Sequence, residues 1–253
     1  MSDIKPRLRV HICPVGFEED RIVIPISKLK ADKVYLITQS GEDLAKGAVQ
    51  RIVTALKSQK LEPTVVCCDI HNLEKCFSTI SEILYREASE GNDVYVNASS
   101  GTNILSIAGT MACMMWGGIP YYAIPETYTY RNEPLHLGVK KIFELPRLRI
   151  IPPRSDLIAI LGFISSKKRG VSHSELVAFL KSRGLIKTEG RKFERPSQVE
   201  NQQLENSFLR ELRDQRGYVI ETGKTRAKRV HLTDEGETAL RMFGFLTGNV
   251  KDP

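Results

Sequence analysis

The sequence predicts an α/β domain with an open, mostly parallel sheet, followed by a smaller and basic α+β domain. Short apolar runs alternate with helical patterns up to residue 146, and a proline-rich segment, 147–153, then breaks the pattern. Residues 1–146 contain 16 Lys and Arg against 17 Asp and Glu, whereas residues 147–253 contain 21 against 13. We therefore expect domains at 1–146 and 154–253 with a linker at 147–153, and only the second should meet a polyanion.

The predicted strands of the first domain are five apolar runs. Their nearly continuous hydrophobicity is typical of strands that are covered on both faces, as in a parallel sheet. The runs lie at residues 7–15, 33–38, 63–70, 93–98 and 119–124.

Helical patterns lie between these runs, at residues 44–56, 73–84 and 104–116. Ser40 or Gly41 is the expected cap near the first helix, and Asn72 is the expected cap of the second. The third is apolar nearly all round, so we expect it to be packed. Repeated strand–helix units with right-handed crossovers predict a Rossmann-like sheet.

Two loops of this sheet have the chemistry of a binding site. In open α/β sheets the ligand lies beyond the carboxyl ends of the strands, where the strand order reverses. The loops at 14–20 and 97–103 follow the first and fourth strands and are rich in small and polar residues, which suit phosphate or another anion. The alternative is that the second loop only turns and caps a helix. The candidate ligand-binding residues are Gly16, Phe17, Asn97, Ser99, Ser100, Gly101, Thr102 and Asn103.

Several function classes are disfavoured. The G-x-G-x-x-G fingerprint is missing after the first strand, Gln39 and Ser40 stand where NAD-binding proteins carry an acidic residue, and no P-loop occurs. The five cysteines include no C-x-x-C pair, and no zinc spacing is found, so we expect reduced thiols, no metal and no cofactor. The apolar run 104–116 is too short to cross a bilayer, and no signal peptide opens the sequence, so we expect a cytoplasmic protein without membrane contact.

The second half predicts three helices. The first spans 156–165, and the second spans 173–183 with Ser172 and Glu175 as a capping box and Gly184 after its end. The third spans about 197–216, with Leu204, Phe208, Leu209 and Leu212 facing the core. Because the second helix of a helix-turn-helix reads base edges with its first residues, the candidate DNA-reading residues are Ser197, Gln198, Asn201 and Gln202.

A basic hairpin follows the third helix. Its strands, 218–220 and 229–232, flank a turn at Gly223, and Thr233 caps a last helix that runs to residue 245. This order is similar to MarR-like winged helix-turn-helix domains, in which the hairpin lies on DNA phosphates. An RNA-binding or protein-binding winged helix remains an alternative. The candidate phosphate contacts are Lys224, Arg226, Lys228 and Arg229.

The loop at 97–103 resembles the signature loop of CARF domains, the CRISPR-associated Rossmann-fold sensors. The opening segment at 11–22 resembles the first strand and loop of archaeal CARF-like regulators with a C-terminal winged helix, and the domain order extends the resemblance over nearly the whole chain. The resemblance implies a homodimer that binds a cyclic oligoadenylate across its two-fold axis through Gly16, Phe17 and residues 99–103. Many CARF loops carry Lys or Arg where this sequence has Asn103, so a phosphate partner is missing.

The sequence thus predicts a ligand-responsive transcriptional regulator that binds double-stranded DNA, without catalytic residues. The main alternative is a CARF-type RNase or a ring nuclease that cleaves its own ligand with help from Ser99, Ser100 or Thr102. The nuclease spacing R-x-x-x-x-H occurs from Arg226 to His231 and at residues 131–136, but the first lies in the hairpin and a proline interrupts the second. The other histidines, His11, His71 and His173, are expected to be structural.

Overall fold

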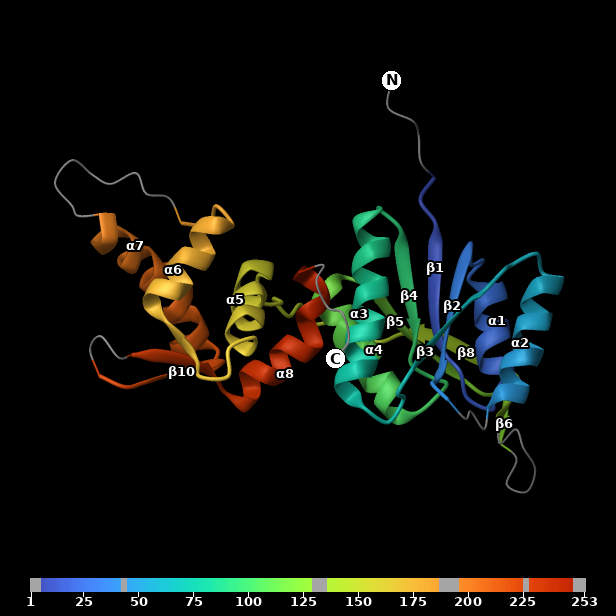
Figure 1. The fold of residues 1–253 in the computed structure, drawn as a ribbon. Coiled ribbons are helices and arrows are strands. Elements are labelled where there is room, and N and C mark those ends of the chain that lie inside the picture. Colours follow the sequence, from blue (N-terminus) through green and yellow to red (C-terminus); the bar gives the residue numbers. More distant parts are fainter. Residues whose placement is uncertain (1–5, 42–44, 129–135, 187–195, 225–227, 248–253) are drawn as a thin grey trace. The chain divides into compact units, whose positions relative to one another are not determined.

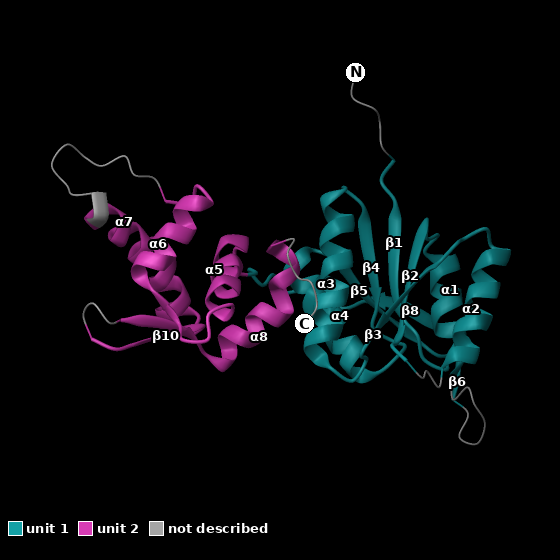
Figure 2. Ribbon diagram, viewed as in Figure 1, with its two compact units in different colours: residues 1–152 teal, residues 153–253 magenta. Residues whose placement is uncertain are grey.

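The computed structural model describes residues 6–41, 45–128, 136–186, 196–224 and 228–247, without the side chains of 196 and 197. The chain forms two compact units, residues 1–152 and 153–253, drawn in teal and magenta in Figure 2.

The first unit is built on a six-stranded sheet in the order β3-β2-β1-β4-β5-β8. The first five strands pair in parallel, and β8 pairs antiparallel with β5 at the edge. A separate short hairpin joins β6 and β7. The strands are β1 (Arg9–Pro14), β2 (Lys33–Gln39), β3 (Thr64–Cys68), β4 (Asp93–Asn97), β5 (Ile119–Ile124), β6 (Thr127–Tyr128), β7 (His136–Leu137) and β8 (Lys141–Glu144).

Helices cover both faces of this sheet: α1 and α2 lie on one side, and α3 and α4 pack together on the other (Figure 1). They are α1 (Asp20–Lys28), α2 (Lys46–Ser58), α3 (Leu73–Ser89) and α4 (Asn103–Trp116). The strand order reverses between β1 and β4. β2 and β3 follow on one side of β1, and the chain then returns to place β4 and β5 on its other side. That reversal is where open α/β sheets bind ligands.

The predicted α/β class and its five parallel strands are confirmed, and so is Asn72 as a cap, since its side chain accepts a hydrogen bond from the backbone N–H of Lys75. The expected cap at Ser40 or Gly41 is wrong, because α2 begins after Ala45 without a side-chain cap. The expected packing of α4 holds for one face, which lies against α3, whereas Ile107 on another face is 53% exposed.

The sheet interior holds one histidine. His11 on β1 is fully buried, stacks on Tyr95 at 4.9 Å between ring centroids, and lies 3.4 Å from the Tyr121 hydroxyl. Burial excludes the charged imidazolium and lowers the pKa of His11 to about 4. His11 is therefore a neutral part of the packing at pH 7.

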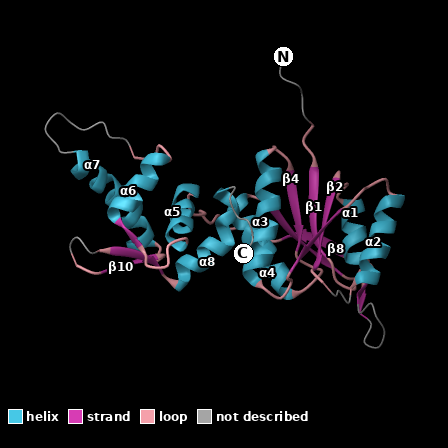
Figure 3. Cartoon of the chain, in the orientation of Figure 1, coloured by secondary structure: helices cyan, strands magenta, loops and turns pink. Residues whose placement is uncertain are grey.

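The second unit has the element order of a winged helix domain, in which three helical segments precede a hairpin and one helix follows it (Figure 3). The hairpin strands β10 and β11 extend to a third short strand, β9, through β11. The elements are α5 (Ser155–Ser165), β9 (Val171–Ser172), α6 (His173–Ser182), α7 (Pro196–Leu204), the π-helical turns η1 (Glu205–Leu209) and η2 (Glu211–Gln215), β10 (Val219–Thr222), β11 (Arg229–Leu232), α8 (Asp234–Phe243) and the 3₁₀ turn η4 (Gly244–Thr247).

The predicted caps of this unit are present. Ser172 and Glu175 form the capping box of α6, and the Thr233 side chain accepts from the N–H of Gly236 at the start of α8. The predicted third helix is continued beyond Leu204 by π turns rather than by α-helix. Its predicted core residues are nevertheless buried, namely Leu204, Phe208, Leu209 and Leu212.

Within the described ranges, no helix combines the length and the apolar character needed to cross a bilayer.

Gly236→Ala tests the packing of α8 against the backbone just before β10. Alanine normally stabilises a helix relative to glycine by about 1 kcal/mol. Here a Cβ at Gly236 would lie 2.0 Å from the carbonyl oxygen of Tyr218, so we expect the free energy of unfolding to fall by about 1–3 kcal/mol. Urea denaturation of the full chain, followed by circular dichroism, measures the change.

Gly162→Ala is the matched control. A Cβ at Gly162, in α5 of the same unit, meets only Leu240 at 3.8 Å, which is ordinary contact. This variant should gain stability, and a similar gain in Gly236→Ala would contradict the described packing.

Candidate functional site

A cavity of about 960 Å³ opens at the carboxyl ends of the parallel strands. Its walls come from the loops after β1, β3 and β4, the end of β2, the first turns of α4, and parts of β5 and β7. It therefore lies at the reversal of strand order that the sequence predicts as the ligand site. The lining residues are Val15, Gly16, Phe17, Glu18, Arg21, Gln39, Ala45, Ile70, His71, Ala98, Ser99, Gly101, Thr102, Asn103, Ser106, Ile107, Tyr122 and His136.

Two glycines let the loops after β1 and β4 touch beneath this cavity. A Cβ at Gly16 would lie 3.0 Å from the backbone nitrogen of Gly101, and a Cβ at Gly101 would lie 2.6 Å from the Cβ of Pro14. Gly101 also has φ +78°, a conformation that side chains disfavour. The glycines predicted to approach a ligand thus first allow the two loops to approach each other.

Six of the eight predicted ligand-binding residues line the cavity, and two do not. Asn97 and Ser100 are buried beside it: the Asn97 amide donates to the Arg21 carbonyl at 2.8 Å, and the Ser100 hydroxyl donates to the Pro14 carbonyl at 2.7 Å. The Ser99 hydroxyl is likewise bonded to Asn97. Thr102 caps α4 by accepting from the N–H of Leu105 at 3.3 Å, so the capping alternative holds for this residue alongside its place in the cavity wall.

A polar group at one end of the cavity was not among the predicted site residues. The Arg21 side chain, only 6% exposed, donates to Glu18 at 2.7 Å and to the Ala123 carbonyl at 3.1 Å. Its guanidinium lies over the Tyr122 ring, 5.1 Å from the centroid. His136 contacts the other oxygen of Glu18. The i,i+3 spacing of Glu18 and Arg21 in the sequence could have indicated their ion pair.

An anion in this cavity would meet backbone N–H donors rather than unpaired cationic side chains. Arg21 is the only Lys or Arg among the described lining residues, and its charge is balanced by Glu18. α4 begins in the cavity wall at Thr102 and Asn103, where the N–H groups of a first helical turn and the helix dipole favour negative charge. In the described ranges no cluster of His, Cys, Asp or Glu has the makings of a metal site.

The second unit presents a polar face on α7. Gln198, Asn201 and Gln202, three of the predicted DNA-reading residues, are exposed and share a shallow hollow of about 430 Å³ with Glu205. The fourth, Ser197, lies on α7, but its side chain is outside the described part. The hollow is thus lined by three amides and one carboxylate.

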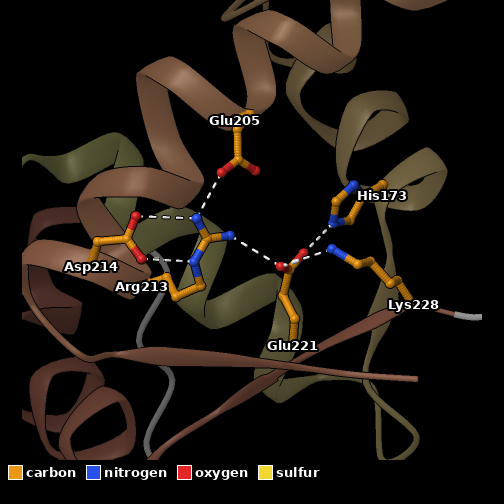
Figure 4. Close-up of polar contacts among 6 residues, drawn as sticks. All are labelled: His173, Glu205, Arg213, Asp214, Glu221 and Lys228. Carbon is orange, nitrogen blue, oxygen red and sulfur yellow. Dashed lines mark hydrogen bonds and ion pairs between the residues drawn. The ribbon is translucent and has the colours of Figure 1, made fainter. Parts of the chain in front are cut away.

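A network of charges connects this helix to the hairpin (Figure 4). The Glu221 carboxylate on β10 lies 2.5 Å from His173 Nε2, 3.0 Å from Arg213 Nη1 and 3.3 Å from Lys228 Nζ. Burial alone would raise the pKa of Glu221, but the contacts with His173 and Lys228 hold it below its ordinary value. Arg213 also donates to Glu205 and Asp214. Arg213 is therefore a structural connection rather than a free surface charge.

The predicted hairpin cations differ in their surroundings. Lys224 is exposed, whereas Lys228 contacts Glu221, and Arg229 donates to the Gly170 carbonyl at 3.1 Å. Lys228 and Arg229 remain 45% and 46% exposed, so both can also meet solvent ions. Arg226 lies outside the described residues.

Comparisons with known families match both units. Residues 9–128 match the family described as HFX_2341-like, N-terminal, and residues 156–244 match the DUF6293 C-terminal winged helix domain. Each of the two units thus matches a domain family of its own. The predicted order, an α/β domain followed by a winged helix domain, is confirmed.

One similar curated protein is the uncharacterized protein MJ1513 of Methanocaldococcus jannaschii, 29% identical over 204 residues. The match covers 68% of this chain and 61% of that protein, so this chain spans about three fifths of its relative.

Solved structures give weaker similarities. Can2 from Sulfobacillus thermosulfidooxidans, in complex with cyclic tetra-adenylate, is 12% identical with a TM-score of 0.44, over 94% of this chain and 64% of Can2. Enterococcus italicus Csm6, bound to cyclic hexa-2′-fluoro-hexa-dAMP, is 10% identical with a TM-score of 0.39, over 84% of this chain and 57% of Csm6. At these TM-scores the ligands of those proteins say nothing about this chain.

Proposed function

We propose that this protein is a ligand-responsive, DNA-binding transcriptional regulator. The observation that carries the proposal is that one chain combines a cavity at the strand-order reversal with a winged helix domain whose α7 exposes three amides. Paired amide donors and acceptors are the groups that read adenine edges in the major groove. The basic balance of residues 147–253 supplies the attraction to phosphates.

The proposed ligand is a cyclic oligoadenylate or a related nucleotide. Its support is the resemblance of the 97–103 loop to CARF loops, together with the chemistry of the cavity. Phe17, 44% exposed in the lining, offers an aromatic ring for a base, and the start of α4 offers N–H groups for phosphate. Because the lining has no unpaired Lys or Arg among its described residues, phosphate affinity should depend on these N–H groups.

The proposed regulator is a homodimer that pairs through α4. Ile107, 53% exposed, stands at the cavity, and Met111 and Met114 follow at helical spacing with partial exposure. An apolar stripe beside the binding site suits a contact between two copies that also encloses a ligand on the two-fold axis. Ligand binding then shifts the arrangement of the paired units by as much as the ligand prefers one arrangement.

Asn103→Asp separates ligand binding from stability. The new carboxylate stands at the first position of α4, where a negative charge favours the helix but repels a phosphate in the cavity. We expect the Kd for cyclic tetra-adenylate or cyclic hexa-adenylate, measured by calorimetry, to rise at least about tenfold, or about 1.4 kcal/mol. Thermal stability without ligand should not fall.

Asn72→Asp is the matched control, since Asn72 caps α3 outside the cavity lining and aspartate caps equally well. Its ligand affinity should equal that of the wild type. Equal affinity in Asn103→Asp would contradict the proposed binding mode, and no binding of either nucleotide to the wild type would exclude cyclic oligoadenylates.

DNA binding is tested by selecting sites from random duplexes and measuring fluorescence anisotropy on the selected site. We expect the two cyclic oligoadenylates to change the DNA Kd of the wild type by about fivefold or more. Asn103→Asp should bind DNA but lose the response. Ligand binding without any change in DNA affinity would refute the coupling between the units.

A second candidate function, cleavage of the bound ligand, is favoured by one observation: two histidines, His71 and His136, line the same cavity as Arg21. One histidine would take the proton of a 2′-hydroxyl as its oxygen attacks the adjacent phosphorus. The P–O5′ bond breaks while the other histidine protonates the leaving oxygen, giving a 2′,3′-cyclic phosphate and a 5′-hydroxyl. Ser99 and Ser100 are weaker candidates than the sequence suggests, because their hydroxyls are bonded to Asn97 and Pro14.

His136→Gln tests this candidate, with His173→Gln in the second unit as its control. If the protein cleaves cyclic oligoadenylate, His136→Gln should lower the rate at least about a hundredfold, the usual contribution of general acid–base catalysis. Mass spectrometry of the products measures the rate. An unchanged rate would remove His136 from the mechanism.

A further inference from the structure

The exposed face of α7 continues into η1 with one group that differs in kind from the amides beside it. Gln198, Asn201, Gln202 and Glu205 stand at i, i+3, i+4 and i+7, which places them on one side of a helix, and they line a common hollow. An amide both donates and accepts hydrogen bonds, whereas an ionised carboxylate only accepts. Glu205 therefore adds an acceptor-only position at the end of the row.

Glu205 is held in place although its side chain is 42% exposed. Arg213 Nη2 donates to Glu205 Oε1 at 2.7 Å from eight residues further along. Glu205 opens the first π turn, and the additional residues per turn of π-helix bring Arg213 back beneath it. The other oxygen, Oε2, has no hydrogen-bond partner among the described residues, so it is available to a donor outside the protein.

Arg213 is itself fixed from three sides (Figure 4). Its Nε donates to Asp214 at 2.8 Å and its Nη1 donates to Glu221 at 3.0 Å. Hydrogen bonds to Asp214 and Glu205 raise the pKa of Arg213 above its ordinary range. Glu221 in turn contacts His173 at the start of α6 and Lys228 of the hairpin. The Glu205 carboxylate is thus oriented by a network that includes three other elements.

We propose that Glu205 is a specificity-determining residue that accepts a hydrogen bond from the N4 amino group of a cytosine in the major groove, and that Arg213 is its positioning residue. This inference rests on the proposed DNA binding through α7. A carboxylate matches cytosine because guanine and thymine present acceptors in its place, and adenine presents the N7 acceptor beside its amino group. The preference for cytosine thus comes from repulsion between the carboxylate and the acceptors of the other bases as well as from the hydrogen bond to N4.

The competing interpretation is a surface ion pair of no consequence for recognition. Such pairs contribute little to stability, and a carboxylate near DNA would then only repel phosphates without regard to sequence. The two interpretations differ in one measurable way. A base-reading carboxylate changes the preference at one position, whereas a repelling carboxylate changes the affinity for all sequences alike.

Site selection with the full-length wild type and Glu205→Gln distinguishes them. We expect the wild type to select a cytosine in each half-site, and Glu205→Gln to lose about tenfold of the preference at that position while keeping the others. Arg213→Met should weaken the same preference, because the carboxylate is then free to rotate. Glu200→Gln is the control: this carboxylate is on the same helix but is paired with Lys181 at 2.9 Å, and its removal should leave the selected sequence unchanged.

The outcomes distinguish failure of the proposed role of Glu205 from failure of the proposed DNA-binding function. If the wild type selects no sequence, the proposed DNA-binding function fails. If the wild type selects a site and Glu205→Gln selects the same site with equal preference, or binds all duplexes more tightly by one factor, the role of Glu205 is refuted. A lost cytosine preference in Glu205→Gln with an intact one in Glu200→Gln supports it.

Discussion

The candidate sensing site depends on the contact between two loops where the strand order of the sheet reverses. β1 and β4 run side by side, but the helices that follow them leave toward opposite faces, so a crevice opens between the loops. Gly16 and Gly101 allow the loops to meet at its base, with Gly101 in a conformation that favours glycine. Any side chain at Gly101 would collide with Pro14 and reshape the walls of the cavity. Backbone contact, rather than a particular side chain, thus sets the shape of the site.

The strands and the location of the site could be predicted because they follow from local patterns. Buried parallel strands are continuous apolar runs, and their order of connection leads to a reversal point. The α1 helix was missed because it is short and contains Pro25. The direction of side chains was beyond such patterns: the hydroxyls of Ser99 and Ser100 point to partners inside the protein, and His136 reaches the cavity from a hairpin far along the chain. Those placements depend on tertiary packing, which residue spacing does not describe.

In the winged helix domain, too, the helix could be predicted from residue spacing, whereas the contacts between elements could not. The spacing of four between Leu204, Phe208 and Leu212 predicted a helix, and it also suits turns wider than 3.6 residues, which the π turns provide. Arg213 lies within the predicted third helix, and residue spacing indicated no partner for it. It is instead bonded to three carboxylates, and the one on β10 comes from beyond the bend at Gly217. The spacing of residues along one helix does not show which side chains of other elements will contact them.

The hairpin and the α7 hollow of the winged helix domain differ in charge. The candidate phosphate contacts in the described part of the hairpin are the cations Lys224, Lys228 and Arg229, whereas the described residues lining the α7 hollow are three amides and one carboxylate. Phosphate contacts give affinity without sequence information, and base contacts give preference with little added charge. In a paired regulator, a ligand that altered the spacing of two such domains would change how well both hairpins reach the phosphates. It would leave each α7 face as it is, so in the proposed regulator a ligand would change DNA affinity without changing the sequence that is preferred.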